Sequence, residues 1–512
     1  MKTGLIYQTV RSRLTNRVRQ EKTSAGAGGF AIAPAESLLL AAVRKPIVLA
    51  VTAAVLLRAV VILAHQQAFW YGDSGDFVAN ALQFVPGPLR PFGYSMFVRM
   101  LLPFHSNVLI AVVQHVMGLG MGILVYVLLR RWRVRPMPAV LAALPVLFEP
   151  RQLAMEHALL SETLFTSCVI GVVAVTLWRQ RLTVPAAVLA GLLLAAATLT
   201  RSIALPLVVI YLLFLLVRRV RLRTLIAAVA SCLAPLFAYG LWFQAHHGVI
   251  GVTSSDGLIL WSRTMSFADC AEIRPPAALV PLCPPKPHQA AATWPWNFLL
   301  DTKLPGHYIT NPDAWLYATD GPPAGPDNNS LARQFALRAI VAQPVDYVLI
   351  VARDVAHTFL MTDPPFDTNA AFRFSGSAFE GVPPQHVHWA AAYGYGDAST
   401  GIATFSTLLR WYERWIFLPG LVLFAVMVAP LVFAVRYKRL PGRSLLPWMM
   451  AVALSVLAIA TNQGDYRYVQ PAIPLACIAT AYILARAKAL RLIARRTNQE
   501  RFGRDRSHAA AP

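Results

Sequence analysis

The chain has 512 residues, of which 56% are hydrophobic and only 14% are charged. An average soluble domain carries about 25% charged residues, so this composition excludes an ordinary soluble enzyme. The formal net charge is +22, and the five cysteines are too few for a disulfide scaffold. Such a basic chain binds either nucleic acid or anionic lipid, and the distribution of its charges decides between the two.

Ten apolar segments are long enough, or nearly so, to cross a hydrocarbon core of about 30 Å as helices. They lie at 46–66, 107–130, 137–150, 161–178, 184–200, 202–217, 223–243, 415–436, 444–461 and 467–486. The third is the weakest, because it is short and contains Pro145. The sequence therefore predicts an all-α polytopic membrane protein.

The charges alternate between successive connections, as the positive-inside rule requires. Every second connection is basic, and together these connections hold 30 of the 46 Lys and Arg residues but only four acids: 1–45, 130–136, 179–181, 218–223, 436–443 and 486–512. We therefore expect a plasma-membrane protein with both termini in the cytoplasm. Its basic face would contact anionic lipid headgroups and not nucleic acid. Residues 1–45 are predicted to be a disordered arm, and 487–512 a basic tail.

Residues 244–414 form an external connection between spans seven and eight that is far too long for a turn. It separates the bundle at 46–243 from the C-terminal helices at 415–486. Its tryptophans favour a folded domain, which we expect to be of mixed secondary structure. Within it, 330–361 is predicted to be an amphipathic helix on the membrane surface or on the domain flank.

Cys270 and Cys283 both lie in this external domain. An oxidising environment outside the cell favours a disulfide between them, and two free thiols are the alternative.

Carboxylates and arginines recur at the outer ends of the spans, in four separate short connections. The candidates are Asp73, Asp76, Arg90 and Tyr94 in the first external loop (67–106), Glu162 opening the fourth span, Arg201 between the fifth and sixth, and Tyr466 and Arg467 at the tenth. Any one of them alone is explained as a solvated loop residue. Arg58 lies inside the first span, either as a buried partner of an aspartate or as a snorkelling side chain. Recurrence on one membrane face predicts a shared site beneath the external domain.

Carboxylates with arginines at the outer leaflet suit displacement at a sugar carbon that is carried on a lipid phosphate. A glycosidase needs two carboxyl groups, because its alkoxide leaving group must be protonated. A phosphate leaves without a proton when arginine forks hold its charge. One carboxylate then suffices as the general base for the acceptor hydroxyl.

The order of these features resembles the GT-C superfamily of polytopic glycosyltransferases, and within it the bacterial branch related to protein mannosyltransferases and aminoarabinose transferases. Asp73 and Asp76 stand where that superfamily has first-loop carboxylates, although they are three residues apart and not adjacent. Residues 90–97 resemble its Arg-Pro-Pro-Gly-Tyr-Pro segment but lack the second proline. Glu162 resembles the acid that opens the fourth span, Arg201 a Thr-Arg step, and 466–471 an Arg-Tyr…Pro element. The resemblance covers most of 46–243 and 444–486.

The resemblance implies transfer of a hexosyl or pentosyl group from a polyprenyl-phosphate donor to an envelope glycan, lipid or protein, with inversion. Asp73 is the expected general base, with Asp76 assisting or taking that role. The remaining expected roles are donor phosphate binding by Arg201 and Arg467, with Arg58 and Arg90 as lesser candidates, and substrate orientation by Glu162, Tyr94 and Tyr466.

This scheme requires no cofactor, and we favour metal independence. A divalent cation remains open, because Asp73, Asp76 and Glu162 are suitable oxygen ligands. The histidine pairs at 246–247 and at His386 and His388 lack the ligand count of a zinc site and are expected on the surface.

Two other function classes stay open. A transporter or flippase with an external domain is the main rival, although transporters place their charged sites near the bilayer midplane, often between repeats. An envelope scaffold or receptor explains the tryptophan-rich domain but not the recurrent arginines and carboxylates.

Overall fold

The described part of the chain consists of helices and the loops that join them. The computed structural model describes residues 46–284, 326–360, 374, 382, 386–395, 401–438, 440–462 and 466–487. The predicted N-terminal arm, nearly all of the basic tail and part of the external domain fall outside these ranges. No strand occurs within them, and one isolated bridge pairs Phe69 with Ala158.

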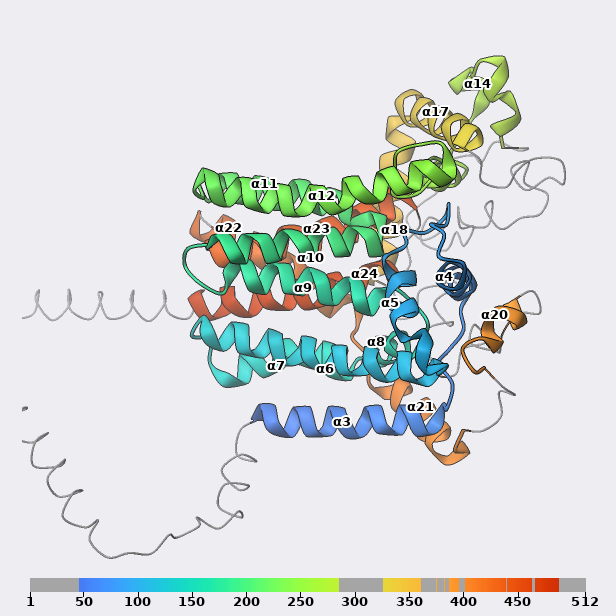
Figure 1. The fold of residues 1–512 in the computed structure, drawn as a ribbon. Coiled ribbons are helices and arrows are strands. Elements are labelled where there is room, and N and C mark those ends of the chain that lie inside the picture. Colours follow the sequence, from blue (N-terminus) through green and yellow to red (C-terminus); the bar gives the residue numbers. More distant parts are fainter. Residues whose placement is uncertain are drawn as a thin grey trace, which may run out of the picture. The chain divides into compact units, whose positions relative to one another are not determined.

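Each predicted span coincides with a helix. Five helices are long and apolar enough to cross a membrane: α3 (Pro46–Ala64), α6 (Asn107–Arg131), α12 (Leu222–His247), α22 (Gly420–Tyr437) and α23 (Gly442–Thr461). Five shorter apolar helices occupy the other predicted spans: α7 (Pro136–Phe148), α9 (Glu162–Leu177), α10 (Val184–Thr200), α11 (Leu205–Val217) and Ala472–Ala487. The chain is thus an all-α membrane protein, and Figure 1 shows these helices side by side.

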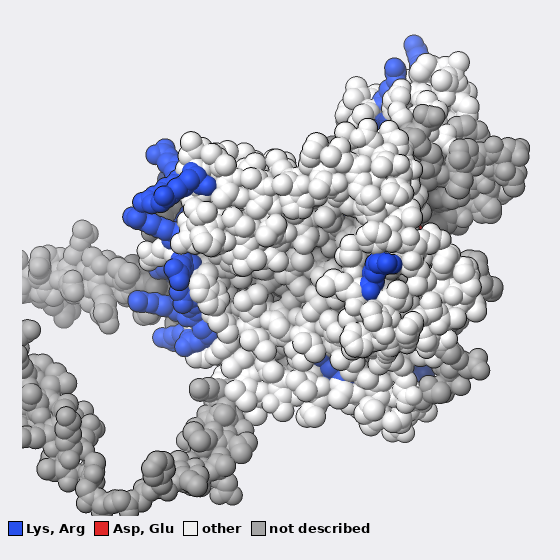
Figure 2. Space-filling model, in the orientation of Figure 1, with Lys and Arg blue, Asp and Glu red and all other residues white. Residues whose placement is uncertain are grey.

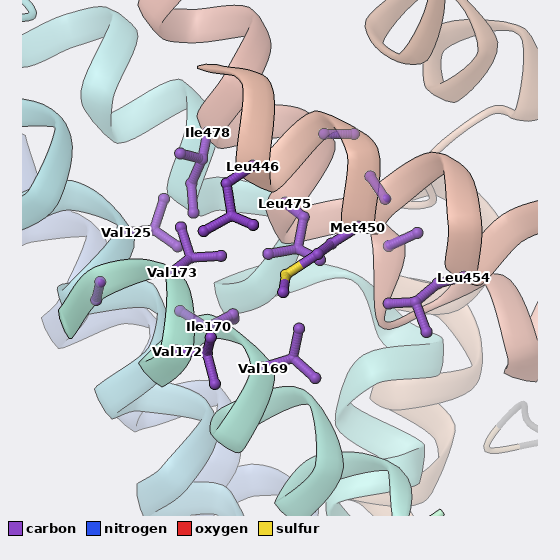
Figure 3. Close-up of a cluster of buried hydrophobic side chains, with 14 of the residues drawn as sticks. Val125, Val169, Ile170, Val172, Val173, Leu446, Met450, Leu454, Leu475 and Ile478 are labelled. Atoms are coloured by element: carbon purple, nitrogen blue, oxygen red, sulfur yellow. The ribbon is translucent and has the colours of Figure 1, made fainter. Parts of the chain in front are cut away.

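A large cluster of apolar side chains lies at the centre of the bundle. Branched side chains of α9, such as Val169 and Val173, pack against Leu446 and Met450 of α23 and against Ile478 (Figure 3). Lipid tails are as apolar as these side chains, so close van der Waals packing holds such helices together in a bilayer.

Lys and Arg side chains gather at one end of the bundle, on the loops that join α6 to α7, α9 to α10 and α11 to α12 (Figure 2). These loops are the predicted cytoplasmic connections. At the opposite end of the bundle lie short helices: α4 (Gly72–Gln83), α5 (Gly93–Leu101), α8 (Pro150–His157), α20 (Val387–Ala391) and α21 (Ala403–Trp415) (Figure 1).

The described part of 244–414 is helical, which differs from the mixed secondary structure that we expected. It contains α13 (Asp256–Thr264), α14 (Cys270–Ile273), η3 (Ala277–Leu282), α17 (Pro326–Ala342) and α18 (Pro344–Leu360) besides α20 and α21. A separate apolar core, which includes Trp261, Phe267 and Phe335, joins α13, α17 and α18. Cys270 and Cys283 form a disulfide at its edge.

The prediction of a single amphipathic helix at 330–361 is wrong in one respect, because the segment forms two helices with a bend of 98° between them. Pro344 follows the break, and proline removes a backbone donor and clashes with the preceding turn. Gln343 fixes the corner: its side-chain oxygen accepts from the Asp269 backbone N–H at 2.9 Å, and its amide donates to Asp346 at 3.2 Å.

Candidate functional site

Five of the sequence-predicted residues meet in one ionic cluster, at the end of the bundle away from the basic loops. They are Asp73, Arg90, Glu162, Arg201 and Arg467. We call this set the ionic cluster. Its members come from α4, the loop before α5, the first residue of α9, the break after α10, and α24 (Tyr466–Val469).

Asp73 lies between two arginines. Its Oδ1 accepts a hydrogen bond from Arg90 Nη2 at 2.8 Å, and its Oδ2 accepts one from Arg467 Nη2 at 2.6 Å. Burial raises the pKa of this carboxyl, but the charges of Arg90 and Arg467 outweigh burial and hold the pKa well below its usual range. Asp73 is therefore a firmly ionised carboxylate.

Arg467 also bonds Glu162, so a single guanidinium joins the two carboxylates. Arg467 Nε and Arg201 Nη1 both donate to Glu162 Oε1. The ring of Tyr71 lies 5.1 Å from the Arg467 guanidinium carbon, and the ring of Tyr468 lies 5.5 Å from that of Arg201. Aromatic faces attract cations, so they help to fix the planes of both arginines.

Local backbone features bring these side chains together. Asp73 is in the first turn of α4, where the helix dipole favours a negative charge. A Cβ on Gly93 would lie 2.5 Å from the carbonyl oxygen of Leu199, so only glycine lets α5 begin directly on the end of α10. That contact lies three residues after Arg90 and two residues before Arg201 in sequence.

Two polar atoms of the cluster are buried without a hydrogen-bond partner in the described structure. They are Glu162 Oε2 and Arg90 Nε. Unsatisfied buried polar atoms are rare in folded proteins and call for an explanation such as a ligand. One is an acceptor and the other a cationic donor, so they suit a ligand that carries both a hydroxyl and an anionic group.

Asp76 follows Asp73 by one turn of α4 and makes no ion pair within the described structure. Burial raises its pKa above the ordinary aspartate value, and the negative charge of Asp73 raises it further. The His386 ring packs against α4 here, since a Cβ on Gly75 would lie 2.4 Å from its Cε1. His386 was expected on the surface. It is half-buried instead, because glycine at position 75 leaves room for the ring.

Besides Asp76, three other predicted site residues are not in the cluster as described. Arg58 bonds Glu156 instead, with Nε to Oε2 and Nη2 to Oε1, both at 2.9 Å. Its remaining donors reach backbone carbonyls of residues 54, 146 and 147, so no donor is left for a phosphate. Tyr94 is fully buried and donates to Gln114 at 3.0 Å, which gives it a packing role. The side chain of Tyr466 lies outside the described structure.

Sequence reasoning missed a second buried polar group, formed by Glu156, His115, His157 and Gln152 around Arg58. Residues 151–160 lie between the third and fourth predicted spans and were expected to be an external connection, but α8 is buried along its whole length. Gly118 of α6 leaves room for this carboxylate, since a Cβ there would lie 1.9 Å from Glu156 Oε1.

The described residues contain no group of three or more His, Cys, Asp or Glu side chains arranged to hold a metal ion. Comparisons with protein-family models, curated proteins and solved structures found no match.

Proposed function

We propose that this protein is a membrane glycosyltransferase that moves a sugar from a polyprenyl-phosphate donor to an acceptor outside the cytoplasm. The observation that carries the proposal is the ionic cluster, in which five charged side chains from distant segments form one hydrogen-bonded group. Clusters of this kind in membrane proteins are expensive to maintain and mark functional sites.

The charge of the cluster supports an anionic ligand. It contains three arginines, Arg90, Arg201 and Arg467, and two carboxylates, so one positive charge is in excess. Guanidinium groups bind phosphate oxygens through paired donors, and the carboxylates hold them ready in fixed planes. The donor phosphate would take the excess charge and compete with Asp73 for its arginines.

The reaction then needs one proton acceptor and no acid. The acceptor hydroxyl oxygen forms a bond to the anomeric carbon while its proton passes to Asp73, and the bond from that carbon to the phosphate oxygen breaks. The electron pair leaves with the lipid phosphate, whose charge the arginines stabilise. Attack from the opposite face inverts the anomeric centre. Glu162, through its free Oε2, would accept a hydrogen bond from a sugar hydroxyl.

In this proposal the protein lies in the plasma membrane and crosses it with all ten spans. The basic loops are in the cytoplasm, and the ionic cluster is outside. The apolar helices α7 and α9 are shorter than a full span. They would still cross the bilayer, because the helices at the outer end lengthen the bundle there. Residues 386–395 pack over the start of α4, with Tyr395 donating to the Ala68 carbonyl at 2.9 Å. This placement supports a role for the external domain in covering the cluster and selecting the acceptor.

The direct test is label transfer by the purified protein. We expect radiolabel from a polyprenyl-phosphate hexose or pentose to appear in a larger envelope product, and slow hydrolysis when water is the only acceptor. Activity should persist in excess chelator, because the arginines supply the positive charge. Counterflow of intact labelled donor across proteoliposomes, without a new covalent product, would instead identify a transporter.

The pH dependence distinguishes the two aspartates. If Asp73 is the base, kcat/KM stays level down to about pH 5, because the free enzyme keeps Asp73 ionised below the usual aspartate pKa of about 3.9. In the donor complex the bound phosphate draws the arginines away from Asp73. The acid-side decline of kcat therefore lies at higher pH than that of kcat/KM. A kcat/KM that already falls above about pH 5 would transfer the role to Asp76, whose pKa is raised.

A further inference from the structure

A row of three hydrogen bonds runs through the buried polar group between α3, α6 and α8. His115 Nδ1 lies 2.9 Å from Glu156 Oε2, and His115 Nε2 lies 3.2 Å from His157 Nδ1. His157 Nε2 lies 3.0 Å from the backbone carbonyl oxygen of Gln67. The three side chains are at most 2% exposed, so no bulk water replaces these bonds.

The row requires one proton more than two neutral histidines carry. A carbonyl oxygen only accepts, so His157 Nε2 must bear a hydrogen. Each of the other two contacts also needs one hydrogen, which makes three in all. Two neutral imidazoles supply two. The third must lie on Glu156 or on one of the histidines.

The surroundings of Glu156 place that proton on the histidines. Its two oxygens accept from Arg58 Nε, Arg58 Nη2, Gln152 and His115, which fills the acceptor sites of an ionised carboxylate. Burial raises the pKa of Glu156, but Arg58 and His115 outweigh it and leave the pKa below its usual value. Burial also holds the pKa of His157 well below its usual range.

We infer that His115 and His157 form a proton-binding pair that shares one proton. The proton is the ligand of this site, and Glu156 is its counter-ion. Both histidines are positioning residues, since neither touches the ionic cluster. The hydrogen bonds of the row require the shared proton, and any effect of the pair on catalysis rests on the proposed function.

The pair adjoins a set of hydrogen bonds, here called the joint, between the chain segment that leads to Asp73 and the segment that leads to Glu162. Besides the His157 bond to Gln67, the Phe69 N–H donates to the His157 carbonyl at 2.9 Å, and the Leu159 N–H donates to the Phe69 carbonyl at 3.0 Å. Ser74 Oγ then donates to the Leu159 carbonyl at 2.9 Å. This joint ties the segment that leads to Asp73 to the segment that leads to Glu162.

Few other charged groups face the pair. Arg58 of α3 is neutralised by Glu156. The His65 ring centre lies 6.0 Å from that of His157, and burial, with the charge of Arg410 on α21, lowers the pKa of His65 to about 4. His65 is therefore neutral at physiological pH and does not replace the shared proton.

Losing the proton would leave two nitrogen lone pairs facing each other at 3.2 Å. One bond of the row must then break. In an unfolded chain the two histidines lose their protons progressively as the pH rises through their ordinary pKa of about 6.5, whereas the hydrogen bonds of the folded pair require one. Stability from the pair is therefore present near pH 6.5 and is lost as the pH rises.

The test compares thermal unfolding of the purified full chain with that of His115→Gln, whose amide donates hydrogen bonds without titrating. Between about pH 6.5 and 9 the unfolding midpoint of the unmodified chain should fall by a few degrees more than that of the variant. The exposed His388 provides the matched control, and His388→Gln should follow the unmodified chain. Equal pH slopes for all three proteins would overturn the inference.

A second readout needs no variant to fold. Nitrogen-15 spectra of histidine-labelled protein at pH 7.5 should show one imidazolium, with hydrogens on both ring nitrogens, among otherwise neutral rings. Neutral signals alone would refute the shared proton. Neither readout uses transferase activity, so the pair can fail while the proposed function holds, and the reverse.

Discussion

Asp73→Asn is expected to lower turnover by about 10²–10⁴-fold, the range that positioned general bases contribute. Asparagine keeps the shape of the side chain but accepts no proton, and it removes the negative charge that holds Arg90 and Arg467 at 2.8 and 2.6 Å. The measurement is single-turnover transfer of labelled sugar at saturating donor. Asp76→Asn should cost much less if Asp73 is the base.

Asp256→Asn is the matched control for this experiment. Asp256 also pairs with an arginine, Arg333, at 2.7 Å, but both side chains are about half exposed. The control should retain activity, and all three variants should elute as folded protein. Full activity in Asp73→Asn would remove that residue from the mechanism and leave the ionic cluster with a binding role only.

Arg58→Met is expected to destabilise the protein by about 3–5 kcal/mol, because it leaves the buried charge of Glu156 without its main partner. Thermal or denaturant unfolding in detergent measures the change. The double variant Arg58→Met, Glu156→Gln should recover part of the loss, because it removes both charges together. Arg223→Met, at an exposed position on α12, should be close to neutral.

A small effect of Arg58→Met would show that Glu156 picks up a proton at little cost. A large effect without recovery in the double variant would show that packing, and not charge, dominates at this position.

The apolar helices were predictable because long apolar runs leave few alternatives in a bilayer. Five of them are long enough to cross a membrane, and the crossing of the five shorter ones stays a prediction. Even the weak third segment contains a helix, α7, in which Pro145 is accommodated in the last turn. The members of the ionic cluster were also predictable in part, since each stands at the same end of its span. What the sequence did not reveal is which of them pair.

The burial of α8 was missed for a physical reason. Half of its residues are polar or charged, and such residues next to spans are usually solvated. Here Glu156 is paired with Arg58, which is 98 positions away in sequence, and with His115, which is 41 positions away. Such long-range pairing leaves no local pattern. The same holds for His386, whose place depends on a glycine in another helix.

The ribosome makes Asp73 long before Arg467, so the contact between these two residues forms late in synthesis. The two residues are 394 positions apart, whereas Arg90 follows Asp73 by only 17. At about 5–20 residues per second, synthesis separates Asp73 from Arg467 by roughly 20–80 s. During that interval Asp73 has only its early neighbour, and Glu162 lacks one of its two arginines. A nascent chain released before residue 467 would thus contain most of the helices but lack the arginine that joins Asp73 to Glu162.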